Sequence, residues 1–314
     1  MKAGGRQKKL MIIVCIILLL IIILLLVASW MLAGMTMTGS RQTIDEAMKW
    51  QSDHYDTGFY QELERKDYTV EGHDGYILHV QLLKNPTESS RYMILSHGYT
   101  DNHIGSLKYV RMYLDLGYNC IIYDLRGHGE NEPTFTTYGT IEAQDLDLLI
   151  KDTRERYPDI EQLGLHGESL GAATTITALK YKPEVDFVVA DCGFSDIENV
   201  LRNGYKSANV PSILFDLADF GARLRFHYSL KDMRPIDSLD GNTIPVLFIH
   251  GEDDAFILPE NSQRMYERTE GPRKIYYMKN AGHAESILTD SVQYREVVEE
   301  YLGEFHLNDF LFFY

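Results

Sequence analysis

The pentapeptide GESLG at residues 167–171 constrains the fold of this chain more than any other stretch of its sequence. It follows the strand-like run Leu163–His166 and precedes the helix-forming run Ala172–Tyr181. A serine between two glycines on a strand-to-helix turn is typical of a nucleophile elbow. Glycine is required there because a side chain at either position would strike neighbouring backbone. We therefore predict that Ser169 is exposed at a helix amino terminus, whose dipole favours developing negative charge.

Apolar runs alternate with amphipathic stretches through the rest of the chain. Strands are predicted at Tyr76–Leu83, Arg91–Ser96, Asn119–Tyr123, Gln162–Leu165, Phe187–Ala190, Val246–Ile249 and Lys274–Met278, and helices at Ile141–Arg156, Ala172–Tyr181 and Val292–Phe305. Several runs are apolar throughout, as in parallel strands that are covered on both faces. The pattern predicts an α/β fold with a mostly parallel central sheet flanked by helices, and functional loops at the carboxyl ends of the strands.

A serine hydroxyl is a weak nucleophile until a base removes its proton, and the base needs a carboxylate to fix its tautomer. In chains with this elbow the order is Ser, Asp or Glu, then His. We predict His283 as the base, because its glycine-containing loop lies between the last strand and the last helix. Asp254, in the loop after the strand Val246–Ile249, is the predicted acid, and we assign its neighbour Asp253 to the turn.

A tetrahedral intermediate also needs two preorganised hydrogen-bond donors for its oxyanion. The backbone N–H of Leu170, next to the serine, is one candidate. The second should come from the loop after the strand Arg91–Ser96, where Tyr99 N–H is the candidate. We interpret His97, at the start of that loop, as a structural hydrogen-bonding residue.

The amino-terminal run Leu10–Ala33 contains 24 residues without a charge, long enough to cross about 30 Å of hydrocarbon. The alternative is a cleaved secretory signal, whose apolar region is usually only about 7–15 residues long. Four basic residues and no acid precede the run or lie in it, and acid-rich chain follows. The positive-inside rule therefore places residues 1–9 in the cytoplasm and the body outside it, with Trp30 at the outer interface.

The net charge indicates which partners to expect, and the cysteine content indicates whether disulfide bonds are expected. Residues 34–314 hold 26 basic and 46 acidic side chains, a net charge of −20. A field of that sign repels phosphate backbones, so we expect no nucleic-acid partner. The sequence has three cysteines, of which Cys120 and Cys192 lie in strand-like runs. We interpret these two as free buried thiols, although one bridge between them is conceivable. No cofactor or metal is expected.

The sequence resembles the α/β-hydrolase superfamily, and within it the membrane-anchored, serine-aminopeptidase-like "cell surface hydrolase" branch. The resemblance extends from about Tyr68 to Leu302. It rests on an ordered set of motifs: HGYTDN at 97–102, YDLRGHGEN at 123–131, GESLG at 167–171, ADCGFSD at 190–196, HGEDD at 250–254 and AGH at 281–283.

The resemblance implies an α/β-hydrolase fold with a small helical cap inserted at about residues 197–243. It also implies that residues 124–129 form a scaffold loop near the active site. That motif usually ends in serine where this chain has Asn131, a change that affects nothing catalytic. The expected organisation is a basic tail (1–9), a transmembrane anchor (10–33), a stalk (34–60) and a hydrolase domain (61–314).

The predicted function is hydrolysis of esters or thioesters with small to medium acyl groups, at the outer face of the cell membrane. A peptidase or amidase of the serine-aminopeptidase type is an alternative, but no acidic pocket for a peptide amino terminus is identifiable. A catalytically silent surface-binding domain is a second alternative. It is disfavoured because a binding role does not need a nucleophile, a base, an acid and an oxyanion loop together.

Overall fold

The computed structural model describes residues 3–305, which divide into two compact units. Of the described residues, one unit contains 3–39 and 201–232, and the other contains 40–200 and 233–305. We call them the helical unit and the sheet unit. The helices are α1 (Ala3–Met37), α2 (Ile44–His54), α3 (Phe59–Glu62), α4 (Leu107–Asp115), α5 (Glu142–Arg156), α6 (Leu170–Ala178), α7 (Ile197–Ser207), α8 (Ile213–Phe226), α9 (Glu260–Arg268), α10 (Ser286–Thr289) and α11 (Ser291–Glu304).

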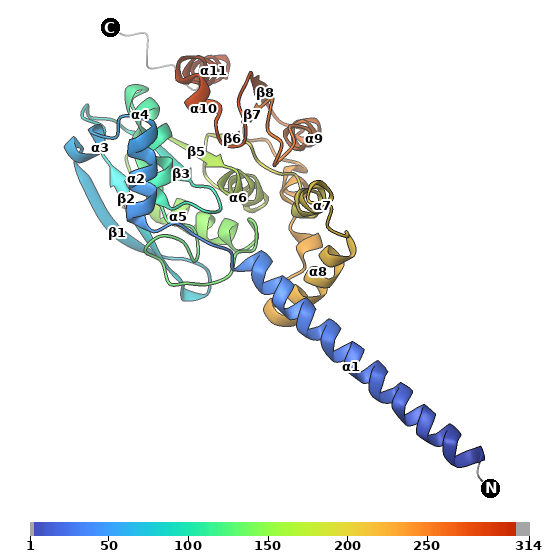
Figure 1. Cartoon of the computed structure of the whole chain (residues 1–314). Helices are drawn as coiled ribbons and strands as arrows, with labels where there is room; N and C mark the ends of the chain where they lie inside the picture. Colours follow the sequence, from blue (N-terminus) through green and yellow to red (C-terminus); the bar gives the residue numbers. More distant parts are fainter. Residues whose placement is uncertain (1–2, 306–314) are drawn as a thin grey trace. The chain divides into compact units, whose positions relative to one another are not determined.

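The sheet unit is organised around one eight-stranded sheet with the order β1-β2-β4-β3-β5-β6-β7-β8 (Figure 1). Its strands are β1 (Arg65–Glu71), β2 (Ile77–Leu83), β3 (Arg91–Ser96), β4 (Asn119–Tyr123), β5 (Gln162–Glu168), β6 (Phe187–Asp191), β7 (Val246–Gly251) and β8 (Arg273–Met278). In sheet order the strands from β4 to β8 run parallel to one another, whereas β2 pairs antiparallel with both β4 and the edge strand β1. The predicted α/β fold with a mostly parallel sheet is therefore confirmed.

The central strands are buried on both faces because helices cover both sides of the sheet. Every residue of β4, β6 and β7 is buried. Alternate residues of a strand point to opposite faces, and one set from these strands joins a core with α4 and α11: Cys120, Ile122, Phe187, Val189, Leu247 and Ile249. This burial explains why the strands read as continuous apolar runs.

The segment that the sequence predicts as a stalk is part of the sheet unit from Ser40 onward. Helix α2 begins with a capping box between Thr43 and Glu46, and its Ala47 is fully buried in the core. The Gln42 N–H donates to the Thr100 carbonyl at 2.8 Å. The packed unit thus starts about 20 residues before the predicted Gln61, because α2 has an apolar face that the core can cover.

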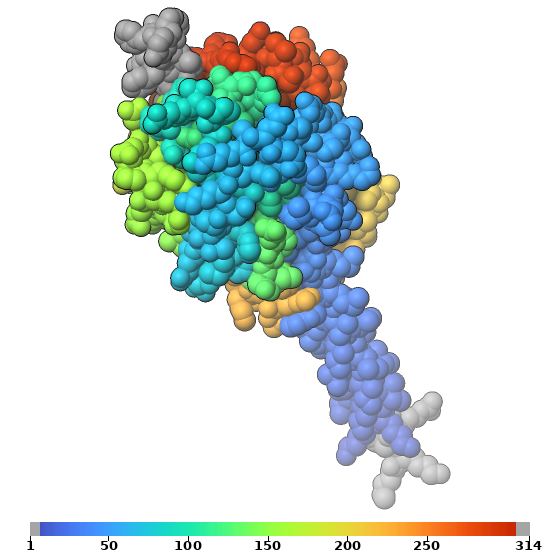
Figure 2. Space-filling model, turned by 90° about the vertical axis from the view of Figure 1, so that its left-hand side faces the viewer, coloured from blue at the N-terminus to red at the C-terminus, as the bar shows by residue number. Residues whose placement is uncertain are grey.

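The helical unit contains α1 and α8, which lie against each other. Gly221 of α8 approaches α1 so closely that a Cβ atom there would lie 1.9 Å from the Ser29 carbonyl oxygen and 3.1 Å from the Ala33 side chain. Ser29 and Ala33 are accordingly buried. The apolar part of α1 closer to the amino terminus is bare (Figure 2), with Leu10 to Val27 exposed. One helix of the described residues, Gln7–Met37, has the length and composition of a membrane span.

The cysteines of the sheet unit carry no bridge. Cys120 and Cys192 are buried free thiols, as interpreted from the sequence. Burial raises the pKa of both thiols well above the usual range. They therefore act as small apolar side chains of the core.

Candidate active site

Ser169 lies on a strained turn between β5 and α6. Its backbone has φ +53° and ψ −110°, a left-handed conformation that a serine rarely adopts. The Ser169 N–H donates to the Asp191 carbonyl of the neighbouring strand β6 at 2.9 Å, which fixes the turn to the sheet. The strain is typical of a nucleophile elbow, in which the backbone is held so that the side chain leaves the sheet.

The two glycines of the pentapeptide have the steric role that the sequence predicts. A Cβ atom at Gly167 would lie 2.2 Å from the Gly171 carbonyl oxygen, and one at Gly171 would lie 2.0 Å from the Ser96 carbonyl oxygen. Both contacts are with backbone, which cannot move aside as a flexible side chain can. No other residue fits either position without displacing the turn.

The structure brings the predicted nucleophile, base and acid into one hydrogen-bonded row. The Ser169 Oγ lies 3.0 Å from His283 Nε2, and His283 Nδ1 lies 2.7 Å from Asp254 Oδ2. In a neutral imidazole, Nδ1–H then donates to the carboxylate and Nε2 accepts the serine proton. His283 comes from the loop after β8 and Asp254 from the loop after β7, at the carboxyl ends of two adjacent parallel strands.

Ser169 is less exposed than predicted, with 7% of its surface accessible. The His283 ring contacts it on one side. The loop after β3 also lies close, since a Cβ atom at Gly98 would be only 3.8 Å from the Ser169 Cβ. The prediction of an exposed serine is therefore wrong, because the His283 ring and the loop after β3 cover a side chain that the turn itself presents.

Asp254, and not Asp253, contacts the histidine. Asp254 is buried, and its Oδ1 accepts the N–H groups of Phe256 and Ile257, each at 2.9 Å. Burial alone would raise the pKa of this carboxyl, but hydrogen bonds from His250 and His283 lower it below its usual range. Asp253 is exposed, and its N–H donates to the Ala281 carbonyl at 3.0 Å. Its backbone thus joins the loops that carry Asp254 and His283.

Sequence reasoning did not assign a role to His250, whose ring contacts the Asp254 carboxylate. This buried residue of β7 has its Nε2 2.7 Å from the Ile257 carbonyl and 3.2 Å from Asp254 Oδ2, and its Nδ1 2.7 Å from Ser262 Oγ. Its ring therefore spans the turn that presents Asp254. The signal was in the sequence, since a histidine that ends a buried strand needs polar partners nearby.

The two candidate oxyanion donors belong to the start of α6 and to the loop after β3. Leu170 is the first residue of α6, and the first N–H groups of a helix have no partner within it. Tyr99 follows Gly98 in the loop that contacts Ser169. The Tyr99 carbonyl lies 2.6 Å from His128 Nε2, so the loop at residues 124–129 supports the loop after β3.

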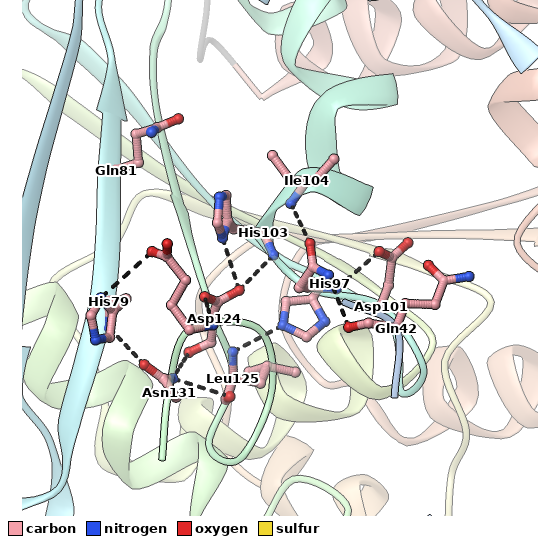
Figure 3. Close-up of polar contacts among 12 residues, drawn as sticks. Gln42, His79, Gln81, His97, Asp101, His103, Ile104, Asp124, Leu125 and Asn131 are labelled. Carbon is pink, nitrogen blue, oxygen red and sulfur yellow. Dashed lines mark hydrogen bonds and ion pairs between the residues drawn. The ribbon is translucent and has the colours of Figure 1, made fainter. Parts of the chain in front are cut away.

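Polar side chains form hydrogen bonds with the loop after β3 and the loop at residues 124–131 (Figure 3). His97 Nε2 accepts the Leu125 N–H at 2.9 Å and Nδ1 lies 2.7 Å from the Gly98 carbonyl, in agreement with a structural role. Asp124 accepts from both the N–H and the ring Nδ1 of His103, at 2.8 and 2.9 Å. Asn131 donates to the Asp124 carbonyl at 2.7 Å and accepts the His79 N–H, so it serves the scaffold.

A group of buried charges lies directly behind the elbow, and sequence reasoning missed it. Glu168, the residue before the serine, lies 2.5 Å from both the Lys108 ammonium and the Tyr109 hydroxyl. The Tyr109 hydroxyl also lies 3.1 Å from Asp191, and the Ser286 hydroxyl donates to the same carboxyl group at 3.2 Å. Burial raises the pKa of Asp191 to about 6.

Among residues 3–305, no group of three or more His, Cys, Asp or Glu side chains is arranged to hold a metal ion.

Comparison with known proteins agrees with this fold. The family model described as serine aminopeptidase, S33, matches residues 87–242. The chain is 32% identical over 283 residues to the uncharacterized protein YqkD of Bacillus subtilis, covering 86% of this chain and 89% of that one. It is 24% identical over 259 residues to the uncharacterized membrane protein YNL320W of Saccharomyces cerevisiae, covering 80% and 84%. The chain belongs to the α/β-hydrolase superfamily.

Solved structures give the same fold. The esterase Pf2001 of Pyrococcus furiosus is similar with a TM-score of 0.66 and 24% identity, over 79% of this chain and 94% of that one. The acylaminoacyl peptidase of Pyrococcus horikoshii has a TM-score of 0.61 and 16% identity, over 79% of this chain and 43% of that one. At these identities the likeness establishes the fold, and the chemistry has to be argued from the site.

Proposed function

We propose that this chain is a membrane-anchored serine hydrolase that cleaves esters or thioesters of small to medium acyl groups. The observation that carries the proposal is the hydrogen-bonded row from Ser169 through His283 to Asp254, with the serine on a strained turn. Nucleophile, base and orienting acid are the three parts of a catalytic triad. The similarity of the fold to solved esterases is consistent with this chemistry.

The proposed reaction has two halves with balanced proton transfers. Ser169 Oγ attacks the acyl carbon while His283 Nε2 takes the serine proton, and the N–H groups of Tyr99 and Leu170 stabilise the oxyanion. His283 then gives that proton to the leaving alcohol or thiol, and an acyl-enzyme remains. Water attacks the acyl carbon with His283 again as base, the acid product leaves, and the proton returns to Ser169.

An amidase or peptidase is the second candidate, because the matching family model is described as a serine aminopeptidase. The same row could carry out this reaction, provided that His283 protonates the amine before it leaves. A panel of acyl esters of increasing chain length, tested beside aminoacyl amides, separates the two by relative kcat/KM. Ester preference supports the proposal, whereas faster amide cleavage favours the peptidase.

Anchoring in the membrane is the other half of the proposal. It is supported by the apolar helix Gln7–Met37, 31 residues that include an 18-residue window with a mean hydropathy of 3.9, and by a yeast relative named as a membrane protein. The charge difference across the helix favours a cytoplasmic amino terminus and an extracytoplasmic body. Protease added to intact spheroplasts should remove the body, whereas its survival until lysis would contradict this topology.

The decisive experiment on the chemistry is covalent labelling of the full chain with a fluorophosphonate probe. Wild type should react, and Ser169→Ala should not react and should lose about 10⁴–10⁶-fold in ester turnover. The exposed Ser291→Ala is the matched control and should react like wild type. The thermal midpoint of Ser169→Ala should stay within a few degrees of wild type, so that loss of labelling reports chemistry and not unfolding. A wild-type chain that never reacts would favour the surface-binding alternative.

A further inference from the structure

Three apolar side chains form a bare stripe along α8 of the helical unit. Ile213, Phe220 and Leu224 are 60%, 50% and 50% exposed. They are seven and four residues apart, a spacing that puts them on one face of the helix. The other face carries the buried Phe215, Ala218 and Ala222. We call the first set the apolar stripe.

The apolar stripe continues onto α1. A groove between the two helices is lined by Leu26, Val27, Trp30, Met31 and Leu224, all of them apolar. The helices approach closely because small residues meet where Gly221 faces Ser29 and Ala33. One wall of the groove therefore belongs to the same helix that has the properties of a membrane span.

The length of α1 places this groove at the edge of a bilayer. A helix rises about 1.5 Å per residue, so about 20 residues cross the hydrocarbon. Counted from Leu10, after Lys8 and Lys9, the crossing ends near Trp30. Tryptophan is enriched at that boundary, and the Trp30 carbonyl accepts a hydrogen bond of 3.3 Å from Arg225 of α8.

The basic residues at the end of α8 fit the same placement. Arg223 and Arg225 lie in its last turn, beside Leu224. The Arg225 guanidinium lies 5.3 Å from the centre of the Trp30 ring. A helix with an apolar face and basic residues next to it is typical of elements that lie in the interface of a membrane, with the basic groups at lipid phosphates.

We propose that α8 is a second membrane contact, with its apolar stripe in the bilayer and lipid acyl chains in the groove against α1. The inference rests on the proposed anchoring by α1 but is independent of the proposed hydrolysis. Continuity of the groove with the span selects lipid over a protein partner, because lipid already surrounds Leu26 and Val27 at that depth. The inserted helices between β6 and β7 would then be a membrane-bound part of the protein.

Depth-dependent quenching of a fluorescent label tests the proposal. The full chain is placed in vesicles of phosphatidylcholine and phosphatidylglycerol that carry a quencher either near the head group or near the chain end. Phe220→Cys and Leu224→Cys, each combined with Cys15→Ser, provide single reactive thiols, because Cys120 and Cys192 are buried. The control is Ala208→Cys in the same background, an exposed residue of the same unit.

We expect the head-group quencher to reduce the fluorescence at positions 220 and 224 at least about twofold more than at 208, as for a helix buried at the acyl boundary. Equal quenching at all three positions, or none at 220 and 224, overturns the proposal. Protection from quenching together with crosslinking between chains also overturns it, in favour of a second copy.

A label on the native Cys15 distinguishes failure of the proposed α8 contact from failure of the proposed anchor. Cys15 lies within α1, so a label on the wild-type chain should be reached by the chain-end quencher if α1 spans the bilayer. Quenching at 15 without quenching at 224 refutes the lipid contact of α8 alone. No quenching at either position refutes the anchor. Reaction of every variant with the fluorophosphonate probe reports separately on fold and hydrolase chemistry.

Discussion

The ammonium group of Lys108 donates a hydrogen bond of 3.2 Å to the carbonyl oxygen of Ala284, the residue that follows His283. The same ammonium lies 2.5 Å from the carboxylate of Glu168, the residue that precedes Ser169. One buried cation thus joins the loop of the proposed nucleophile to the loop of the proposed base. Burial lowers the pKa of Lys108, but the Glu168 carboxylate outweighs it and raises the pKa above its usual value, so the group stays charged.

Lys108→Met should destabilise the protein by about 3–5 kcal/mol, because it leaves the Glu168 carboxylate buried without its partner. Fluorophosphonate reaction should slow as well, since both loops lose a common support. Adding Glu168→Gln should recover part of the stability, because no buried charge then lacks a partner. Urea unfolding of the two variants measures this, with the exposed Lys279→Met as the matched control. A double variant no more stable than Lys108→Met would count against the ion pair.

The two neighbouring aspartates should differ sharply in their effect on turnover. Asp254→Asn should reduce kcat by about 10⁴-fold, because an amide cannot hold the His283 tautomer as a carboxylate does. Asp253→Asn should have little effect, since its side chain is exposed and it contributes a backbone N–H. Ester hydrolysis by the two variants gives the ranking. The reverse order would show that the wrong acid is assigned.

His97 should make the fold sensitive to acid. Burial, with a smaller effect from His128, lowers the pKa of His97 from 6.5 to about 3 in the folded chain. Below pH 6.5 the unfolded chain therefore binds a proton that the folded chain does not, and stability falls as pH falls. The loss should approach about 1.4 kcal/mol per pH unit between the two pKa values.

His97→Gln removes this proton uptake and isolates the effect from other groups. The variant should be less stable than wild type at pH 7, because an ordered acceptor for Leu125 N–H is disturbed. The gap should narrow as pH is lowered from 6.5 to 5. Unfolding by urea at several pH values measures the gap, and a gap independent of pH would contradict a neutral buried imidazole.

Gly171→Ala should prevent correct formation of the elbow. The added methyl group would lie 2.0 Å from the Ser96 carbonyl oxygen, a contact that the backbone of β3 has to move to relieve. We expect a loss of several kcal/mol and no fluorophosphonate reaction. Gly303→Ala is the control, because a Cβ atom at this α11 position meets nothing within 4 Å. That variant should be as stable as wild type or up to about 1 kcal/mol more stable.

The sequence was most informative where burial dictates residue type. The strands Arg91–Ser96 and Asn119–Tyr123 are found with the predicted bounds, because both faces are covered and the runs are apolar. The edge strand β1 was missed, since it has one buried residue, Val70, and several charges. Helix α4 was also missed, although its apolar face packs in the core.

The candidate site likewise has a part that the sequence predicts and a part that it does not. Ser169, Asp254 and His283 could be predicted because their order and their places after strands are properties of the chain. The support from His250 and Lys108 could not, since it depends on which side chains meet across separate elements. The partial burial of Ser169 was missed for the same reason, because its cover comes from two other loops.

The close approach of Gly221 to Ser29 has a practical consequence for handling this protein. A version shortened to begin at Ser40 would lose more than its tether, because α8 would lose the surface against which it packs. The uncovered face would add to the apolar stripe already bare on the same helix. Such a version should aggregate or bind detergent through residues 213–226, so enzymology on the full chain in detergent or lipid is the sounder starting point.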